Sequence, residues 1–452
     1  LLGVAVDLEG HVITEARLVD IVEQHKTLPK IAEYLVMSGG RYIFAISNGR
    51  EKRLYLDPAG MYSAVYNAQE QIIASTATLA VSSPLQPNDS YPLWDIAAYP
   101  RGGRFAFGNT LDVRGTQISA NTYLNINSWT TQRHWPYKDQ DFRCTSLDDV
   151  NASVDIVSKR HSQIIGALAA HHPVALPVTG GQDSRLLLAF SKPHKDKIKL
   201  FFSHVTNFNT QVDASTAAAL CARIGVPHET FQIQGNIKAY RPKLPLRDLR
   251  RRYLIRRGYL VEDSDLQLTP LLKRELSAFS AVPEGHLVLR GHVTDICKAV
   301  LWRRTGITWS KQNPVGAMPA DRGVSLMQLC PKALGYVDTD YFYPAYDAWK
   351  SELPQNAEKR SIDLMGLEQY RPYGLGLTFN GHEDNFYMAP GNDRQIIAAL
   401  AKTPPEMRAQ LHVNDLLLRS AAPELHDVKY VREKDNLLRR SRKACETYLE
   451  TA

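Results

Sequence analysis

One stretch of the chain combines a flexible loop with a carboxylate in a way that suits a phosphorylated ligand. The apolar run 174–178 has strand character, a Thr-Gly-Gly turn follows at 179–181, and an apolar helix is predicted behind Asp183 and Ser184. Adjacent glycines let a backbone approach a ligand closely, and a helix N-terminus offers N–H groups and its positive dipole end to phosphate. A carboxylate repels phosphate unless a divalent cation lies between them, so Asp183 indicates a metal site. The alternative is an ordinary strand-to-helix turn that Asp183 caps.

The turn resembles the Ser-Gly-Gly-x-Asp-Ser signature of the ATP pyrophosphatases, which cleave ATP between its α and β phosphates. It differs from the Gly-x-x-x-x-Gly-Lys loop of other nucleotide-binding proteins. The resemblance implies ATP and Mg²⁺ as cofactors, with Asp183 as a metal ligand. The implied nucleotide-binding residues are Thr179, Gly180, Gly181, Gln182, Asp183 and Ser184, among which Thr179 replaces the first serine of the signature.

The composition is that of a globular protein with room for about two domains. The chain has 452 residues, of which 44% are hydrophobic and 22% charged, and chains of this length usually divide. The net charge of +7 favours acidic ligands such as a nucleotide, a peptide carboxylate or nucleic acid. Five widely spread cysteines without a C-x-x-C pair argue for a reducing compartment and against a disulfide framework or structural zinc.

The sequence predicts no membrane segment. It has no run of about 18 apolar residues and no basic-plus-apolar leader, so we expect a cytoplasmic protein without membrane contact. The chain begins at Leu1 rather than at Met, which leaves room for missing residues before it. The oligomeric state does not follow from the sequence.

The pattern of elements predicts two domains, an antiparallel β-rich one at 1–140 and an α/β one at 141–452. In the first, Asn48-Gly49 between two alternating runs is a strong hairpin signal, and further strands are expected at 62–66, 71–75, 103–107 and 122–126. In the second, a helix capped by Ser146 precedes predicted strands at 174–178, 198–204, 228–233 and 287–290, with a helix at 213–224. This alternation predicts a doubly wound parallel sheet with ligands at the carboxyl ends of its strands. Past about Thr308 we expect only helices and loops.

With this arrangement the whole chain resembles the asparagine synthetase and β-lactam synthetase family. The first domain matches the family at 40–46, 56–66 and 107–123, followed by Trp135. The resemblance implies a glutaminase-like fold of the Ntn type for the first domain. For the second it implies an ATP pyrophosphatase fold with added helices. Some peptide-cyclising relatives, the lasso peptide cyclases, share the Gly-His-x-x-Asp pattern found at 291–295.

The glutaminase members of this family use a cysteine at the mature N-terminus as nucleophile, activated by its own amine. The first cysteine here is Cys144, which lies outside the first domain. We therefore expect either a scaffold, as in the β-lactam synthetases, or a glutaminase whose true N-terminus is missing from the sequence.

The second family signature is a Ser-Gly-x-Gly-x-Asp turn whose aspartate holds a second metal ion against pyrophosphate. In this chain Gly291 and Asp295 match it, and Val293 replaces its second glycine. The resemblance adds Gly291 to the nucleotide-binding residues, and Asp183 and Asp295 together would hold two Mg²⁺ ions. Helix capping is the alternative role for Asp295. Asp213 lies where the family has an acidic residue near the start of a helix.

His292 stands where relatives carry a Glu or a Tyr that recognises or activates the attacking amine. An imidazole with a pKa near neutrality could deprotonate an ammonium nucleophile before it attacks the acyl adenylate. His292 is therefore a candidate catalytic residue, and a structural histidine is the alternative.

Two further catalytic candidates, Glu383 and Lys434, follow from the resemblance alone. The segment 388–393 resembles the family's Arg-x-Pro-Phe-x-Asp turn, whose upstream glutamate is displaced here, and Glu383 is the nearest carboxylate. Lys434 ends an Arg-x-Lys motif whose lysine stabilises negative charge on the adenylate. The alternatives are a solvated loop glutamate and a surface lysine in a basic tail.

A strongly basic segment at 238–257 has no counterpart in the family. Such a segment can hold RNA phosphates, and tRNA-modifying enzymes use the same loop signature. Interleaved apolar residues such as Leu249 and Leu254 instead favour a helix with one buried side and a solvated basic side. We prefer the second interpretation and do not expect nucleic acid as a partner.

Arg185 occupies a position where the family commonly has a small residue. In the first helical turn its charge opposes the helix dipole, so we expect an anionic neighbour. That neighbour is either part of the fold or the substrate, and the sequence leaves both open.

Together these residues predict an ATP-dependent, AMP-forming carbon–nitrogen ligase. A small-molecule or peptide carboxylate would attack the α phosphate to give an acyl adenylate and pyrophosphate, and an amine would then displace AMP. Without a glutaminase cysteine that amine is ammonia or belongs to a substrate, which includes closure of a lactam or macrolactam. Three alternatives stay open: a glutamine-dependent amidotransferase truncated at its N-terminus, a tRNA-modifying adenylating enzyme, and a non-catalytic scaffold descended from such enzymes.

Overall fold

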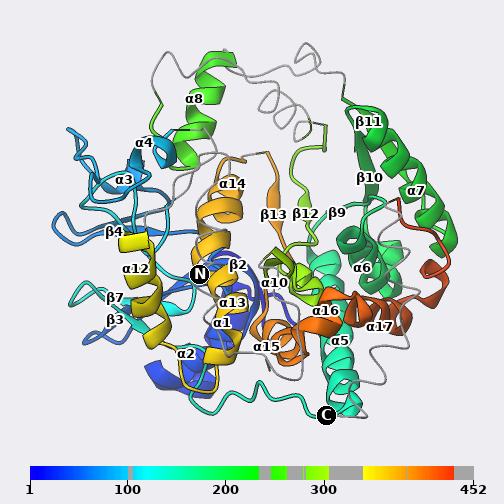
Figure 1. The fold of residues 1–452 in the computed structure, drawn as a ribbon, viewed down its shortest axis with the longest axis horizontal. Coiled ribbons are helices and arrows are strands. Elements are labelled where there is room, and N and C mark those ends of the chain that lie inside the picture. The colour runs from blue at the N-terminus through cyan, green and yellow to red at the C-terminus, as the bar shows by residue number, and fades with distance from the viewer. Residues whose placement is uncertain are drawn as a thin grey trace.

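The computed structural model describes residues 1–99, 105–233, 246–261, 278, 281–304, 339–382 and 384–431. Within them the protein is a mixed α/β structure with an antiparallel five-stranded sheet, a parallel five-stranded sheet and a small three-stranded sheet. In Figure 1 the parallel sheet runs from the centre to the right, and the N-terminal elements lie mainly to its left. The structure thus confirms the predicted α/β class with one antiparallel and one parallel part.

The antiparallel sheet has the strand order β1-β2-β3-β7-β8. Its strands are β1 (Leu2–Val6), β2 (Gly39–Ser47), β3 (Lys52–Leu56), β7 (Thr122–Asn125) and β8 (Thr130–Arg133). The predicted Asn48-Gly49 hairpin joins β2 to β3, with Phe44 opposite Tyr55. The sequence analysis did not predict β1, nor the helices α1 (Glu15–His25) and α2 (Leu28–Val36) that separate β1 from β2.

The small sheet has the order β5-β4-β6, and it fits the sequence prediction only in part. It consists of β4 (Val65–Asn67), β5 (Ile72–Ala74) and β6 (Thr116–Gln117). The predicted strand at 103–107 is wrong for 105–107, which form no strand, while 103 and 104 lie outside the described residues. Phe107 has a φ of 54°, which breaks an extended run.

The parallel sheet carries the candidate site and has the order β11-β10-β9-β12-β13. Its strands are β9 (Val174–Pro177), β10 (Leu200–Val205), β11 (Glu229–Gln232), β12 (Leu287–Leu289) and β13 (Phe386–Met388). Ala175 lies level with Leu200 on one side and with Val288 on the other. The order reverses between β9 and β12, and ligands of such sheets bind outside the carboxyl ends at this switch point.

Four of these strands were predicted, and β13 corrects the expectation that only helices and loops follow Thr308. β13 is three residues long and pairs with β12, with Tyr387 opposite Val288. A strand this short shows too few alternations to be recognised from sequence.

The long helix α5 (Leu147–His171) leads into β9 and begins as predicted. The Ser146 hydroxyl accepts a hydrogen bond from the backbone N–H of Asp149 at 3.2 Å, and its own proton points to the Asp149 carboxylate at 3.3 Å. The helix buries Val150, Val157 and Ile164. α7 (Phe208–Ile224) begins five residues before the predicted start at 213, because Asn207 and Thr210 form a capping box there.

The remaining helices cover the sheets or connect their strands. They are α3 (Ala77–Ala80), α4 (Trp94–Ala97), α6 (Gln182–Ser191), η1 (Lys192–Lys197), α8 (Leu246–Arg256), η4 (Thr294–Lys298), α10 (Val300–Arg304), α12 (Thr339–Ser351), η6 (Glu358–Arg360), α13 (Ser361–Met365), the π-helical segments η7 (Gly366–Tyr370) and η8 (Pro372–Gly376), α14 (Leu377–Asn380), α15 (Arg394–Lys402), α16 (Pro405–Ala409), α17 (His412–Ala421) and η9 (Pro423–Leu425). The largest apolar core includes Val6, Met61 and Trp135 together with the strands of the parallel sheet, so it crosses the expected boundary at 140/141. The division at that point stays a prediction.

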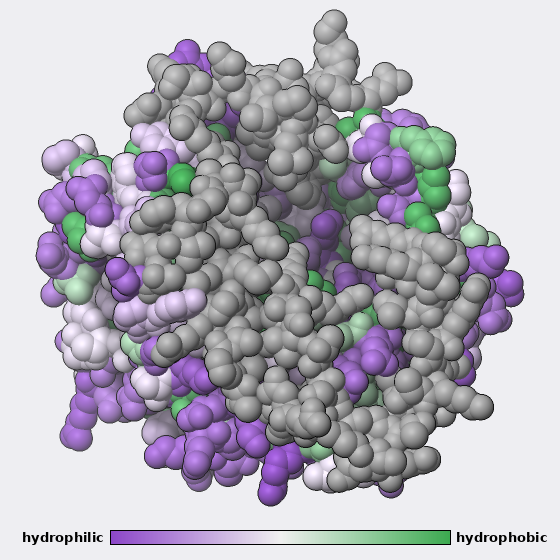
Figure 2. Space-filling model, in the orientation of Figure 1, coloured by the Kyte–Doolittle hydropathy of each residue, from purple (hydrophilic) through white to green (hydrophobic). Residues whose placement is uncertain are grey.

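Among the described residues no helix is both long and apolar enough to cross a membrane. On the face drawn in Figure 2, the coloured part of the surface is largely hydrophilic, with hydrophobic side chains interspersed.

Candidate nucleotide and metal site

The loop after β9 forms the strand-to-helix turn predicted from the sequence. α6 begins at Gln182 with Gly181 as N-cap, and because Gly181 has no side chain, no side-chain hydrogen bond caps the helix. The backbone N–H groups of the first turn are therefore available to an anion. Asp183 lies in this first turn and is not the capping residue, which rules out the alternative role considered for it.

Two hydroxyl groups close this loop. The Thr179 and Ser184 hydroxyl oxygens lie 2.8 Å apart, and the Ser184 hydroxyl is 3.0 Å from the backbone nitrogen of Thr179. The backbone N–H of Gly181 donates to the Thr179 hydroxyl at 3.2 Å. Threonine keeps the hydroxyl of the serine it replaces, so the substitution is compatible with the geometry of the turn.

The loop after β12 lies directly against the first one. A Cβ atom placed on Gly291 would be 2.9 Å from the Asp183 Cβ and 3.0 Å from its carbonyl oxygen. Val293 has a φ of 70°, a conformation that favours glycine. The backbone therefore has a glycine-like conformation at Val293, where the signature that this loop resembles has its second glycine, at a cost of about 1–3 kcal/mol.

The two aspartates of the site each have a cationic partner. Lys298 Nζ lies 2.6 Å from Oδ1 and 2.7 Å from Oδ2 of Asp183, and it donates its hydrogen bond to Oδ2. Arg371 donates from a terminal nitrogen to Oδ1 of Asp295 at 2.7 Å. Asp295 is thus an ion-pair partner within η4 and not a helix cap.

Burial and these two cations determine the direction in which the pKa of each aspartate is shifted. Burial raises the pKa of Asp183, while the Lys298 ammonium draws it down and the nearby Asp295 carboxylate raises it further. For Asp295, burial is outweighed by the Arg371 and Lys298 cations, which hold its pKa below the ordinary value. Two carboxylates on adjacent loops are hard oxygen donors that fit Mg²⁺ in kind, but in this arrangement their charges are already balanced.

A buried histidine supports the Asp295 loop. The Nδ1 of His161 is 2.9 Å from the Val157 carbonyl oxygen, so it carries the proton, and Nε2 accepts from the Thr294 hydroxyl at 2.9 Å. The His161 ring stacks on Phe190 of α6 with 4.4 Å between centroids. One neutral imidazole therefore connects α5, α6 and η4.

His292 lies in the same loop and is half-buried. Burial, and after it the Arg290 cation, lower the pKa of His292 to about 3. Its Nδ1 has no hydrogen-bond partner among the described residues. At neutral pH the ring is uncharged, and it is a weaker base than the near-neutral imidazole expected from sequence.

The segment after α17 contacts the first loop. A Cβ on Gly180 would lie 2.4 Å from a methyl carbon of Val431 and 2.9 Å from Asp213 Oδ1. Asp213 therefore lies beside the loop. Glu383 and Lys434, the other two catalytic candidates, lie outside the described residues.

The turn at 388–393 has a structural role here. The Asp393 carboxylate accepts from the backbone N–H of Gln395 and Ile396, capping α15, and pairs with Arg160 at 2.9 Å. All three of these partners belong to the fold, and Asp393 is fully buried. The basic segment is described from residue 246 on, because 234–245 lie outside the described residues. In α8, Tyr253 and Leu254 are buried while Arg251 and Arg252 are exposed, as predicted for a half-buried helix, but Arg250 is buried as well.

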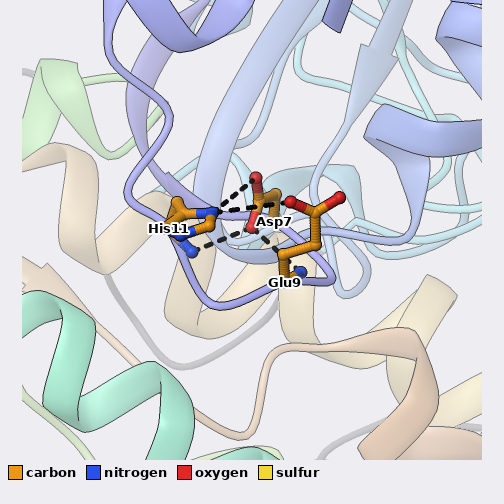
Figure 3. A group of neighbouring side chains, drawn as sticks. All are labelled: Asp7, Glu9 and His11. Carbon is orange, nitrogen blue, oxygen red and sulfur yellow. Dashed lines mark hydrogen bonds and ion pairs between the residues drawn. The ribbon is translucent and has the colours of Figure 1, made fainter. Parts of the chain in front are cut away.

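A second group of potential metal ligands, Asp7, Glu9 and His11, lies at the end of β1 (Figure 3). Asp7 accepts backbone hydrogen bonds from Glu9 and His11, and Arg17 pairs with both carboxylates at 2.6 and 2.7 Å. Arg17 already satisfies this group, so we assign it to the turn and not to a metal centre.

A cavity of about 70 Å³ adjoins the site. It is lined by Asp295, Ile296, Val300, Leu301, Asp363, Gly366, Tyr370 and Arg371. Asp363 is paired with the buried Arg408 at 2.8 Å. The cavity has room for water-sized groups beside Asp295.

Sequence analysis missed Lys298, Arg371 and His161. Lys298 follows Asp295 by three residues in a 3₁₀ helix, where residues three apart share a face. This spacing would have placed Lys298 at the site if the 3₁₀ helix had been predicted. Arg371 and His161 come from distant helices, and the sequence offers no local signal for them.

No protein-family model matches the chain, and no curated protein is significantly similar to it.

Proposed function

We propose that this chain is an ATP-dependent, AMP-forming carbon–nitrogen ligase of the asparagine synthetase and β-lactam synthetase type. Its α/β part would be an ATP pyrophosphatase domain, and its β-rich part a glutaminase-like scaffold. The substrates would be a small-molecule or peptide carboxylate and an amine that does not come from glutamine, including an amine of the same molecule.

One observation carries the proposal. Two loops with an aspartate each, Asp183 and Asp295, meet at the carboxyl ends of β9 and β12, where the strand order reverses. Gly291 allows the backbone of the second loop to touch Asp183. An uncapped helix N-terminus between carboxylates suits a phosphate chain accompanied by a divalent cation.

Each residue of the site would have its own role in binding the phosphates, the metal ion or the amine. The first turn of α6 would bind phosphate through its N–H groups, while Thr179 and Ser184 keep the loop closed. Asp183 and Asp295 would hold Mg²⁺, which supplies charge neutralisation for the phosphates. The amine must attack in its neutral form, because an ammonium ion has no lone pair, and the uncharged His292 ring would accept a hydrogen bond from that amine.

Pyrophosphate release from ATP tests the proposal. A panel of carboxylic acids, including amino acids and peptides, is supplied with ATP and Mg²⁺, and we expect release that depends on the acid. Asp183→Asn should reduce it by about 100-fold or more, the scale of losing one electrostatic contact to the reacting phosphates.

Asp196→Asn is the matched control, because Asp196 is exposed on η1. It should release pyrophosphate like the wild type. Equal release by the wild type and Asp183→Asn would show that the proposed nucleotide and metal site is wrong.

A further inference from the structure

Lys298 occupies the position on Asp183 that a metal ion would need. Its Nζ is within 2.7 Å of both carboxylate oxygens. A divalent cation and an ammonium ion repel each other strongly at such separations. In this geometry Asp183 can therefore bind either the Lys298 ammonium or a metal ion, but not both.

The second cation of the site is held differently. Arg371 is almost buried, with 7% of its side chain exposed, and lies between the π-helical segments η7 and η8. Glu368 in η7 is fixed by two hydrogen bonds from Arg133, and the Tyr373 hydroxyl in η8 accepts from the backbone of Gly108. Arg371 is thus anchored on a stretch of helix that other parts of the chain hold in place.

Lys298 has more freedom to change partners. It ends the five-residue helix η4, whose flanking residues Val293 and Ala299 both have positive φ angles of 70° and 45°. Its ammonium stands on a flexible four-carbon stem with three donors and no fixed plane. The Lys298 side chain is 14% exposed, twice the value for Arg371, and rotation about its four-carbon stem can move Nζ while the backbone stays in place.

We propose that Lys298 exchanges partners: it neutralises Asp183 in the free protein and passes to an anionic phosphate ligand when a divalent cation takes Asp183. This inference rests on the proposed function, because it places the metal and the phosphate at the same loop. It assigns Lys298 two roles, one that opposes metal binding and one that favours phosphate binding.

The two roles predict effects of opposite sign in one variant. In Lys298→Met, Asp183 loses its competing cation, so Mn²⁺ alone should bind about tenfold more tightly by isothermal titration calorimetry. Inorganic pyrophosphate in the presence of Mg²⁺ should bind about tenfold more weakly, because the transferred ammonium is missing. A purely structural lysine would weaken both ligands together.

Three further variants complete the experiment. Asp183→Asn should lose Mn²⁺ binding, and Lys298→Gln replaces the methionine variant if thermal melting shows that the latter is unfolded. Lys402→Met is the matched control, because Lys402 is a partly exposed lysine paired with Asp141 and Asp149, and both affinities should stay at the wild-type values.

The outcomes separate this inference from the proposed function. Unchanged or weaker Mn²⁺ binding in Lys298→Met overturns the exchange, even where pyrophosphate release from ATP depends on an acid and on Asp183. The opposite shifts of the two affinities support the exchange, even where no acid tested promotes release.

Discussion

The guanidinium group of Arg185 lies over the ring of Tyr430, with 4.0 Å between its central carbon and the ring centroid. The same group donates hydrogen bonds to the backbone oxygens of Leu425, Val428 and Lys429. Arg185 is fully buried, so it clamps the segment after α17 onto the first turn of α6. These carbonyl oxygens are the negative ends of peptide dipoles, and they stabilise the Arg185 cation at the helix N-terminus.

This clamp gives the first prediction. Arg185→Met should lower the free energy of unfolding by about 2–4 kcal/mol, because it leaves buried carbonyl oxygens without donors. In a double-mutant cycle with Tyr430→Leu, measured by urea unfolding, the coupling should be about 1–2 kcal/mol.

Arg143→Met serves as the control for this prediction. The Arg143 side chain is 88% exposed and pairs only with Asp141 among the contacts described, at 3.1 Å. Its loss should change stability by less than about 0.5 kcal/mol. Strictly additive effects of the Arg185 and Tyr430 changes would show that the stacking contributes nothing.

The part of the site that was predictable is the part encoded locally. The strand, the glycine turn and the apolar helix around Asp183 are consecutive in sequence, and they form β9, the loop and α6 close to the predicted bounds. The capped start of α5 at Ser146 was predictable for the same reason. Each of these features depends on neighbouring residues and their intrinsic preferences.

The charge partners were not predictable, because long-range packing selects them. Lys298 is 115 residues from Asp183, and Arg371 is 76 residues from Asp295. No residue next to Asp183 specifies Lys298 as its partner, and none next to Asp295 specifies Arg371. The same applies to β13, a strand of three residues that exists because β12 offers it a free edge. The proposed Lys298 exchange therefore became visible only from the coordinates.

Gly291 provides the second prediction. In Gly291→Ala the added Cβ would meet backbone atoms of Asp183 at 3.0 Å, so the loops after β9 and β12 must separate. We expect pyrophosphate release from ATP to fall by about tenfold or more, with a modest loss of thermal stability.

Gly181→Ala is the comparison for this change. Gly181 lies in the same site, but its added Cβ would meet only the Thr179 hydroxyl, at 3.3 Å. This variant should melt like the wild type. If it also loses activity, the glycine is needed for close approach of the ligand and not for the fold. Wild-type activity in Gly291→Ala would contradict the tight contact between the loops.

A buried ion pair between the N-terminal sheet and the helical segment at 361–380 gives the third prediction. Glu368 is fully buried and accepts two hydrogen bonds from Arg133, at 2.8 and 2.9 Å, and one from Trp349 at 2.7 Å. Glu368→Gln leaves the Arg133 charge without its main partner and should cost about 3–5 kcal/mol in urea unfolding.

Arg133 offers its own control for the Glu368 prediction. It also lies 3.7 Å from Glu352, whose side chain is 61% exposed. Solvent screens this second pair, so Glu352→Gln should change stability by less than about 1 kcal/mol. Similar losses in the two variants would mean that burial does not strengthen the Glu368 pair.

The last prediction concerns pH. Burial lowers the pKa of His161 and His204 to about 4, whereas a histidine in an unfolded chain titrates near 6.5. Between these values the unfolded chain binds protons that the folded protein does not, so stability is complete above pH 6.5 and declines as the pH falls toward 4. Each such histidine contributes a slope of up to about 1.4 kcal/mol per pH unit, measurable as urea midpoints from pH 7.5 to 4.5.

A pair of histidines on α5 makes this pH prediction specific. His161 and His171 both place Nδ1 2.9 Å from the carbonyl oxygen four residues earlier, but His161 is buried and His171 is exposed. His161→Gln should reduce the pH slope by about one proton's contribution. His171→Gln is the matched control, because it removes an exposed imidazole that makes the same backbone contact on the same helix. An equal reduction in both variants would show that burial of His161 is not the source of the acid sensitivity.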